Sequence, residues 1–152
     1  MSKRTAADAA LMPLIVADIY ELAGRLRARG DGIAATVGQT QARWQVLSAA
    51  SGDTLSVPQI ARRLGITRQA VQRLADLLAA EGLASYTDNP DHKSSPHLVL
   101  TKAGRDALAR LTRSARAGQE DLAAAMEAVD IARLRRDLRT LLDAVKISTR
   151  GE

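Results

Sequence analysis

The chain has 152 residues, a length that predicts one folded domain with a single hydrophobic core. It contains no cysteine, which excludes disulfides, thiolate metal sites and cysteine nucleophiles. Aromatic residues make up 2% of the chain, too few for the stacking platform that single-stranded nucleic acid requires. Of the 22 basic residues, 18 are arginine, the side chain best suited to phosphate and guanine. Nucleic acid is therefore the first partner to test.

The excess positive charge is concentrated in the middle of the sequence. Residues 55–113 carry a net charge of +4, whereas residues 1–54 carry +1 and residues 114–152 carry none. A solvated basic face would explain this charge as well as a binding surface would. No run of 18 apolar residues and no secretory signal is present, so we expect a soluble cytoplasmic protein without a membrane span.

Apolar spacing predicts two helices in the first third of the chain. We expect the first to end near Arg29, because Gly30-Asp31-Gly32 follows and glycine weakens a helix. The second covers about 40–50, with Trp44 and Leu47 on one face. The apolar stripe of the first helix consists of Leu11, Ile15, Ile19, Leu22 and Leu26.

Two short helices joined by a tight turn are predicted next. Ser56 is a plausible N-cap with Pro58 in the first turn, and Gly65 supplies the left-handed turn position. Thr67 caps the following helix, which ends at Glu81-Gly82. Their buried stripes are Val57, Ile60, Ala61 and Leu64, and then Val71, Leu74 and Leu78.

A hairpin and two long helices complete the pattern. Residues 83–86 and 97–100 are predicted strands, joined by a polar, turn-rich loop over residues 88–96. Thr101 caps a long helix, and a final helix has near-heptad spacing. Their stripes are Ala103, Ala107, Leu108, Leu111 and Ala115, and then Ile131, Leu134, Leu138, Leu141 and Val145.

Two short helices with a glycine-containing turn, followed by a hairpin, predict a winged helix-turn-helix. The first residues of the second helix must reach base edges in the major groove, and here they are long and polar. The helix N-terminus can hold a phosphate, and the polar loop can follow a flanking backbone. The candidate DNA-binding residues are Ser56, Thr67, Arg68, Gln69, Gln72, Arg73, His92 and Lys93. We expect no catalytic, cofactor or metal site.

The sequence here resembles the MarR family of winged-helix transcriptional regulators. The motifs that carry the resemblance are RWQVL at 43–47, ARRLGITRQAVQR at 61–73, LLAAEGL at 77–83, DHKSSP at 91–96 and LTKAGR at 100–105. The resemblance covers about residues 10–145, because the flanking helices match the family's dimerisation helices in order and length.

The resemblance implies a mainly α fold with a small β-hairpin wing. It implies a single domain over 1–152, with a DNA-binding lobe at 40–101 and dimerisation helices at 8–30 and 102–148. Such a homodimer binds a pseudo-palindromic operator, usually as a repressor, and a small-molecule inducer releases it in some members. Two departures matter: the family's Asp-x-Arg wing pattern reads Asp91-His92-Lys93 here, followed by Ser94, and the cysteine of the redox-sensing branch is absent. An inducer must therefore act without a cysteine.

Other interpretations stay open at this point. An architectural DNA binder or a protein-docking module would use the same fold without operator specificity. An enzyme is disfavoured, because no nucleophile, base or metal cluster is evident and Asp76 and Glu81 look like ordinary helix carboxylates. The polar face of the second short helix could be merely solvated. Trp44 is expected in the core or beside a small-molecule pocket, and His97 is expected to be structural.

Overall fold

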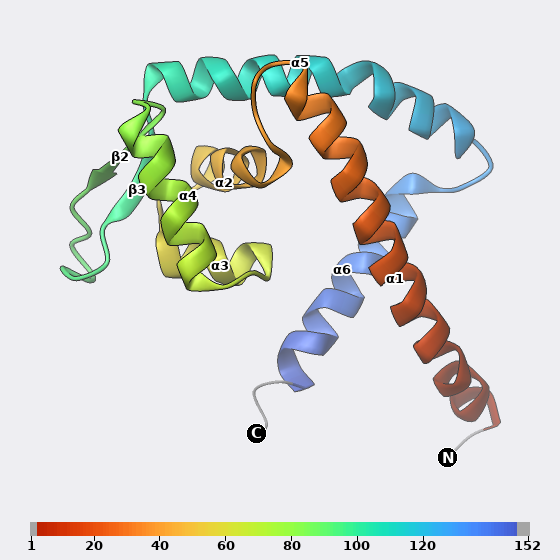
Figure 1. Ribbon diagram of the computed structural model, residues 1–152. Helices are drawn as coiled ribbons and strands as arrows, with labels where there is room; N and C mark the ends of the chain where they lie inside the picture. Colours follow the sequence, from red (N-terminus) through yellow and green to blue (C-terminus); the bar gives the residue numbers. More distant parts are fainter. Residues whose placement is uncertain (1–2, 149–152) are drawn as a thin grey trace. The chain divides into compact units, whose positions relative to one another are not determined.

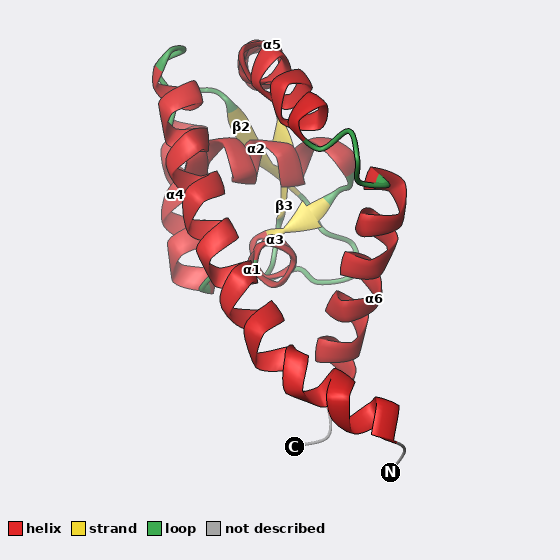
Figure 2. Ribbon diagram, turned by 90° about the vertical axis from the view of Figure 1, so that its right-hand side faces the viewer, coloured by secondary structure: helices red, strands yellow, loops and turns green. Residues whose placement is uncertain are grey.

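The computed structural model describes residues 3–148, which form six helices and a small three-stranded antiparallel sheet (Figures 1 and 2). The helices are α1 (Lys3–Ala35), α2 (Gln41–Gly52), α3 (Val57–Leu64), α4 (Arg68–Ala80), α5 (Lys102–Ala125) and α6 (Ile131–Ser148). The strands are β1 (Leu55–Ser56), β2 (Ala84–Thr87) and β3 (His97–Leu100). This mainly α architecture with a small wing confirms the predicted fold class. The chain divides into two compact units, with the boundary between Ala115 and Arg116.

Helix α1 differs from the prediction, because it continues through Gly30 and Gly32 to Ala35. Gly30 is buried, and a Cβ atom there would lie only 2.1 Å from Oε1 of Gln41. The glycine therefore permits close packing of α1 against α2 and does not end the helix. The predicted end near Arg29 is wrong. The helix that was expected within residues 8–30 begins earlier, at Lys3, and ends later, at Ala35.

The helix-turn-helix follows the local signals in the sequence. Ser56 is the N-cap of α3, where Oε1 of Gln59 accepts hydrogen bonds from the Ser56 backbone N–H at 2.7 Å and hydroxyl at 2.9 Å. Gly65 has φ 66°, the left-handed conformation that ends α3 after Leu64. Oγ1 of Thr67 then accepts from the backbone N–H of Ala70 at 3.2 Å and caps α4. These three predictions are confirmed.

The end of α4 is tied to the start of α5. Gly82 has φ 70°, and the backbone N–H of Leu83 donates to the carbonyl of Leu78 at 2.8 Å, as in a Schellman motif. The hydroxyl of Thr101 donates to the carbonyl of Gly82 at 2.6 Å and accepts from the backbone N–H of Gly104 at 3.1 Å. Thr101 thus caps α5, as predicted, while also holding the chain that leaves α4.

The sheet contains one strand more than the predicted hairpin. Its order is β1-β3-β2, with Tyr86 paired to Leu98 on one side of β3 and Leu55 paired to Leu98 on the other. Strand β1 was not predicted, because it has only two residues and exists through its pairing with β3. The helices α2, α3 and α4 cluster beside this sheet (Figure 1).

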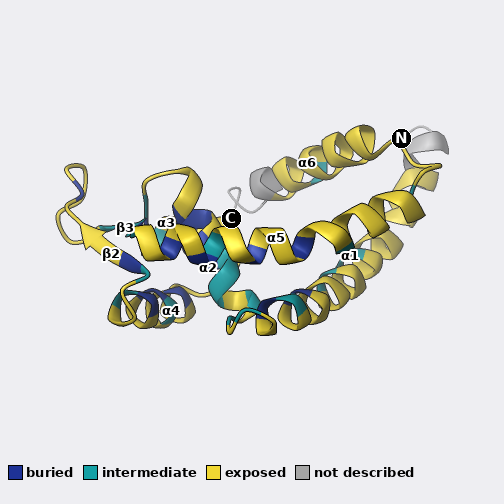
Figure 3. Cartoon of the chain, turned by 90° about the horizontal axis from the view of Figure 1, so that it is seen from above, coloured by how far each residue is buried: buried dark blue, intermediate teal, exposed yellow. Residues whose placement is uncertain are grey.

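The hydrophobic core is formed by α2, α3, α4 and the sheet, together with Leu111 of α5. Its largest fully buried side chains are Leu47, Ile60, Leu78, Leu98, Leu111, Val46 and Val71. Buried positions also recur along α5 up to residue 115 (Figure 3), where Gly104 occupies the stripe position expected for Ala103. This core fixes the back faces of α3 and α4, and their opposite faces are left to solvent.

The long helices expose apolar side chains. On α1, Leu14 is 60% exposed and Leu22 is 51% exposed. On α6, the predicted stripe forms but most of it is exposed, including Leu134 and Val145. No helix in residues 3–148 is long and apolar enough to cross a membrane.

Candidate DNA interface

Helix α4 turns a polar face to solvent near its N-terminus. Val71, Ala75 and Leu78 are fully buried on the back of the helix. The opposite face is exposed, and near the N-terminus it carries Arg68, Gln69, Gln72 and Arg73. The Thr67 cap satisfies one of the first backbone N–H groups, and others remain at the helix end to meet an anion. This face has the size and chemistry that the major groove of duplex DNA accepts.

Within residues 3–148, neither arginine of α4 has a carboxylate partner, and the same holds for Arg62 on α3. Arg63 pairs with Asp53 at 2.7 Å, and Arg43 pairs with Glu81. Over the described part of the chain, the side chains of Arg68 and Arg73 make neither an ion pair nor a hydrogen bond. Their guanidinium groups are therefore available for phosphate or guanine without first breaking an internal contact.

Gln72 alone among these exposed residues is held by internal hydrogen bonds. Its Nε2 donates to Oδ1 of Asp76 at 2.9 Å and to the hydroxyl of Tyr86 at 2.9 Å. The Tyr86 hydroxyl in turn donates to the same Oδ1 at 2.6 Å. Partial burial, together with the Asp76 carboxylate, raises the pKa of Tyr86 to about 12, so the phenol keeps its proton at neutral pH. These hydrogen bonds join α4 to the wing strand β2.

The wing loop is ordered by a buried asparagine. Asn89 is 8% exposed, its Nδ2 donates to the carbonyl of Ser95 at 2.8 Å, and its Oδ1 accepts from the backbone N–H of Asp91 at 3.1 Å. These bonds close the loop on itself and leave His92 and Lys93 exposed at its far end. Asn-Pro at 89–90 is a turn signal in the sequence, but the tertiary role of the amide was not predicted.

A polar cleft of about 350 Å³ lies between α3, the start of α4 and the wing. It brings Arg68 and His92 to one place, together with Arg62. Ser56 also lines it, but this serine is only 4% exposed and its hydroxyl already donates to Gln59, so we leave it out of the proposed interface. A second groove, on the outer side of α4, is lined by Gln69, Gln72, Arg73, Asp76 and Leu77.

The predicted residues therefore fall into distinct positions. Six of them lie on the exposed start of α4 or on the wing loop: Arg68, Gln69, Gln72, Arg73, His92 and Lys93. Thr67 lies at the helix cap that precedes them. Their contacts with DNA stay predictions. Asp76 and Glu81, expected to be ordinary helix carboxylates, each accept a hydrogen bond from a side chain on another element.

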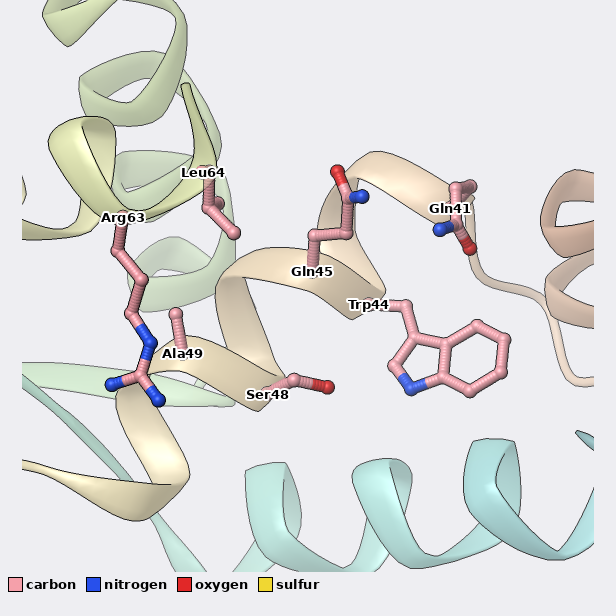
Figure 4. A pocket seen from close by; sticks show the side chains of 7 residues that line it. All are labelled: Gln41, Trp44, Gln45, Ser48, Ala49, Arg63 and Leu64. Atoms are coloured by element: carbon pink, nitrogen blue, oxygen red, sulfur yellow. The ribbon is translucent and has the colours of Figure 1, made fainter. Parts of the chain in front are cut away.

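A further cleft, of about 320 Å³, lies between α2 and α3 (Figure 4). Trp44 and Gln41 line one part of it from α2, and Arg63 lines another from α3. Trp44 is half-buried and packs against the core, as expected, while its role beside a small-molecule pocket stays a prediction. Within the described residues, no cluster of three His, Asp or Glu side chains could hold a metal ion.

Comparison with known proteins identifies relatives of this chain. Residues 37–93 match the model of the MarR family. An uncharacterised protein of Mycobacterium tuberculosis is 49% identical over 132 residues, which cover 87% of this chain and 92% of that protein. The structure of the transcriptional repressor CouR bound to a 23-mer DNA duplex is 26% identical, with a TM-score of 0.66, over 90% of this chain and 94% of that one.

A solved MarR/EmrR family transcriptional regulator from Acinetobacter sp. ADP1 has the same fold. Its TM-score is 0.77 at 21% identity, over 90% of this chain and 97% of that chain. The matched segment 37–93 contains the helix-turn-helix and the first part of the wing described above. By sequence and by fold, this chain belongs to the MarR family of winged-helix transcription regulators.

Proposed function

We propose that this protein is a sequence-specific regulator of transcription that binds double-stranded DNA through α4 and the wing. The observation that carries the proposal is the pair of unpartnered guanidinium groups, Arg68 and Arg73, on the exposed start of α4. An arginine can contact O6 and N7 of guanine together, and such a contact distinguishes guanine from the other bases. The exposed wing residues His92 and Lys93 would contact the flanking backbone or minor groove.

We propose a homodimer as the binding species. The exposed apolar residues of α1, such as Leu14 and Leu22, and those of α6, such as Leu134, form stripes that a second copy would cover. The dimer region would comprise α1 and residues 102–148. Two-fold symmetry would place two recognition helices about one turn of B-DNA apart, roughly 34–36 Å, and would require a pseudo-palindromic operator.

We propose repression as the regulatory outcome. The structurally similar protein CouR is a transcriptional repressor, and a bound protein that covers promoter DNA blocks transcription by occupancy. Release of the DNA by a small organic molecule is part of the same proposal, with the cleft at Trp44 and Arg63 as its place of binding (Figure 4). Since the chain has no cysteine, such a molecule would bind without forming a thiol adduct.

The experiment measures the affinity of the purified protein for the DNA upstream of its own gene and for random duplex of equal length, at one salt concentration. We expect the upstream DNA to bind at least about a thousandfold more tightly, the lower bound for specific regulators. A ratio near one would favour the alternative, an architectural DNA binder without operator specificity. No binding to either duplex would leave only a protein-docking module.

A further inference from the structure

The side-chain amide of Gln72 is held in one orientation by two partners from different elements. The three polar atoms form a closed triangle: Gln72 Nε2 lies 2.9 Å from Asp76 Oδ1 and 2.9 Å from the Tyr86 hydroxyl oxygen, and that hydroxyl lies 2.6 Å from the same Oδ1. Asp76 lies one helical turn beyond Gln72 on α4, whereas Tyr86 comes from β2. Strand β2 therefore helps to fix the orientation of the Gln72 side chain.

The chemistry of the triangle assigns its donors and acceptors. A carboxylate only accepts hydrogen bonds, so the amide nitrogen and not the amide oxygen of Gln72 must face Asp76. For the same reason the Tyr86 proton points to Asp76, and the Tyr86 oxygen is left to accept from the Gln72 amide nitrogen. The amide nitrogen of Gln72 thus faces both acceptors on one side, while its Oε1 makes no hydrogen bond within the described residues.

This assignment limits what Gln72 can recognise. A free glutamine reads adenine with two bonds, accepting from N6 and donating to N7. Gln72 cannot make the second bond while its amide nitrogen stays turned to Asp76 and Tyr86. Its free oxygen can accept only from an amino group, which in the major groove means N6 of adenine or N4 of cytosine. Guanine and thymine present carbonyl oxygens at the corresponding place and offer no donor.

We propose that Gln72 is a specificity residue that selects an amino base, adenine or cytosine, without distinguishing between the two, and that Tyr86 and Asp76 are its positioning residues. This inference rests on the proposed function, since it requires α4 to enter the major groove. The location of Gln72 supports it: the residue lines both the outer groove of α4, with Arg73, and a cleft beside the wing, with Arg68. It therefore lies between the two arginines available for base contacts.

The test selects binding sequences from a random duplex library with the full-length protein and four variants. Gln72→Ala identifies the operator position that Gln72 reads, as the position at which base preference relaxes. At that position we expect the unmodified protein to bind adenine and cytosine within about threefold of each other, and both more tightly than guanine or thymine. Tyr86→Phe removes one of the two acceptors that hold the amide nitrogen, so adenine should then be favoured over cytosine by about fivefold or more, the lower bound of a bidentate contact.

Two further variants keep the result interpretable. Asp76→Ala removes the other acceptor and should shift preference toward adenine in the same direction, even if Tyr86→Phe weakens the fold. Tyr20→Phe removes the same hydroxyl from an exposed tyrosine on α1 and should leave the adenine-to-cytosine ratio unchanged.

Failure of this inference can be separated from failure of the proposed function. An adenine-to-cytosine ratio that is the same in Tyr86→Phe as in the unmodified protein overturns the inference while sequence-specific binding stands. A Gln72→Ala profile that relaxes at no position does the same. If the unmodified protein enriches no sequence at all, the proposed function is wrong and the inference falls with it.

Discussion

Replacing Gly104 with alanine should destabilise the protein, although alanine is the better helix former. A Cβ atom at this position would lie 1.9 Å from the carbonyl oxygen of Leu83, where ordinary contacts begin at about 3.4 Å. The obstacle is backbone, and it cannot rotate away as a side chain could. The same carbonyl accepts a hydrogen bond from the backbone N–H of Thr101 at 3.2 Å, so any movement strains the junction between α4 and α5.

The magnitude follows from three contributions. Forcing a methyl group into a packed site costs about 1–3 kcal/mol, and weakening the Thr101 hydrogen bond costs about 1 kcal/mol more. The gain in helix propensity from glycine to alanine returns about 1 kcal/mol. The free energy of unfolding should therefore fall by about 2 kcal/mol. For a chain of this length such a loss lowers Tm by roughly 4–8 °C.

Thermal unfolding followed by circular dichroism measures this change. All proteins must be compared at one chain concentration, because a dimer makes Tm depend on concentration. Gly52→Ala is the matched control: it lies at the end of α2, has nothing within 4 Å of the added Cβ, and should leave Tm unchanged or slightly raised. If Gly104→Ala is as stable as Gly52→Ala, the close approach of α5 to Leu83 is not a feature of the folded protein.

Three other predictions address the core, an ion pair and the binding species. Leu78→Ala should cost about 2–5 kcal/mol in denaturant unfolding, because this fully buried leucine supports the back of α4; a loss below 1 kcal/mol would contradict its burial. The hydrogen bond from Arg43 lowers the pKa of Glu81 from its ordinary value of 4.5. The stability that this ion pair contributes is therefore fully present above pH 4.5 and is lost as the pH falls through the lowered pKa of Glu81. In acid titrations, Glu81→Gln should flatten the pH dependence of the free energy of unfolding. For about eight phosphate contacts by a dimer, the logarithm of affinity should fall with the logarithm of salt concentration at a slope near −7, whereas about −3.5 would indicate a single copy.

Most of the helix-turn-helix could be predicted because its signals are local. Ser56, Gly65 and Thr67 act on backbone groups only a few residues away, and the period of the apolar residues fixes which helix faces are buried. The exposed positions of α4 follow from the same period. The local pattern of a single sequence therefore indicates both the motif and the side chains that it presents.

What could not be predicted depends on contacts between distant segments. Strand β1 exists because Leu55 pairs with Leu98, and α1 continues through Gly30, where the missing side chain leaves room for Gln41. The spacing of Gln72 and Asp76 on one helix was visible in the sequence, but nothing in it indicated that Tyr86 would complete their hydrogen-bond network. The orientation of the Gln72 amide, and with it the proposed base preference, required the structure.

The most direct test of the central claim is the affinity of Arg68→Ala for the selected operator and for random duplex. We expect a loss of about 1–3 kcal/mol on the operator, with preference relaxed at one base position and a much smaller change on random DNA. The control is Arg110→Ala, which removes the same charge from an exposed position on α5 and should affect both duplexes slightly and equally. Equal losses for Arg68→Ala and Arg110→Ala on both duplexes would contradict a recognition role for α4.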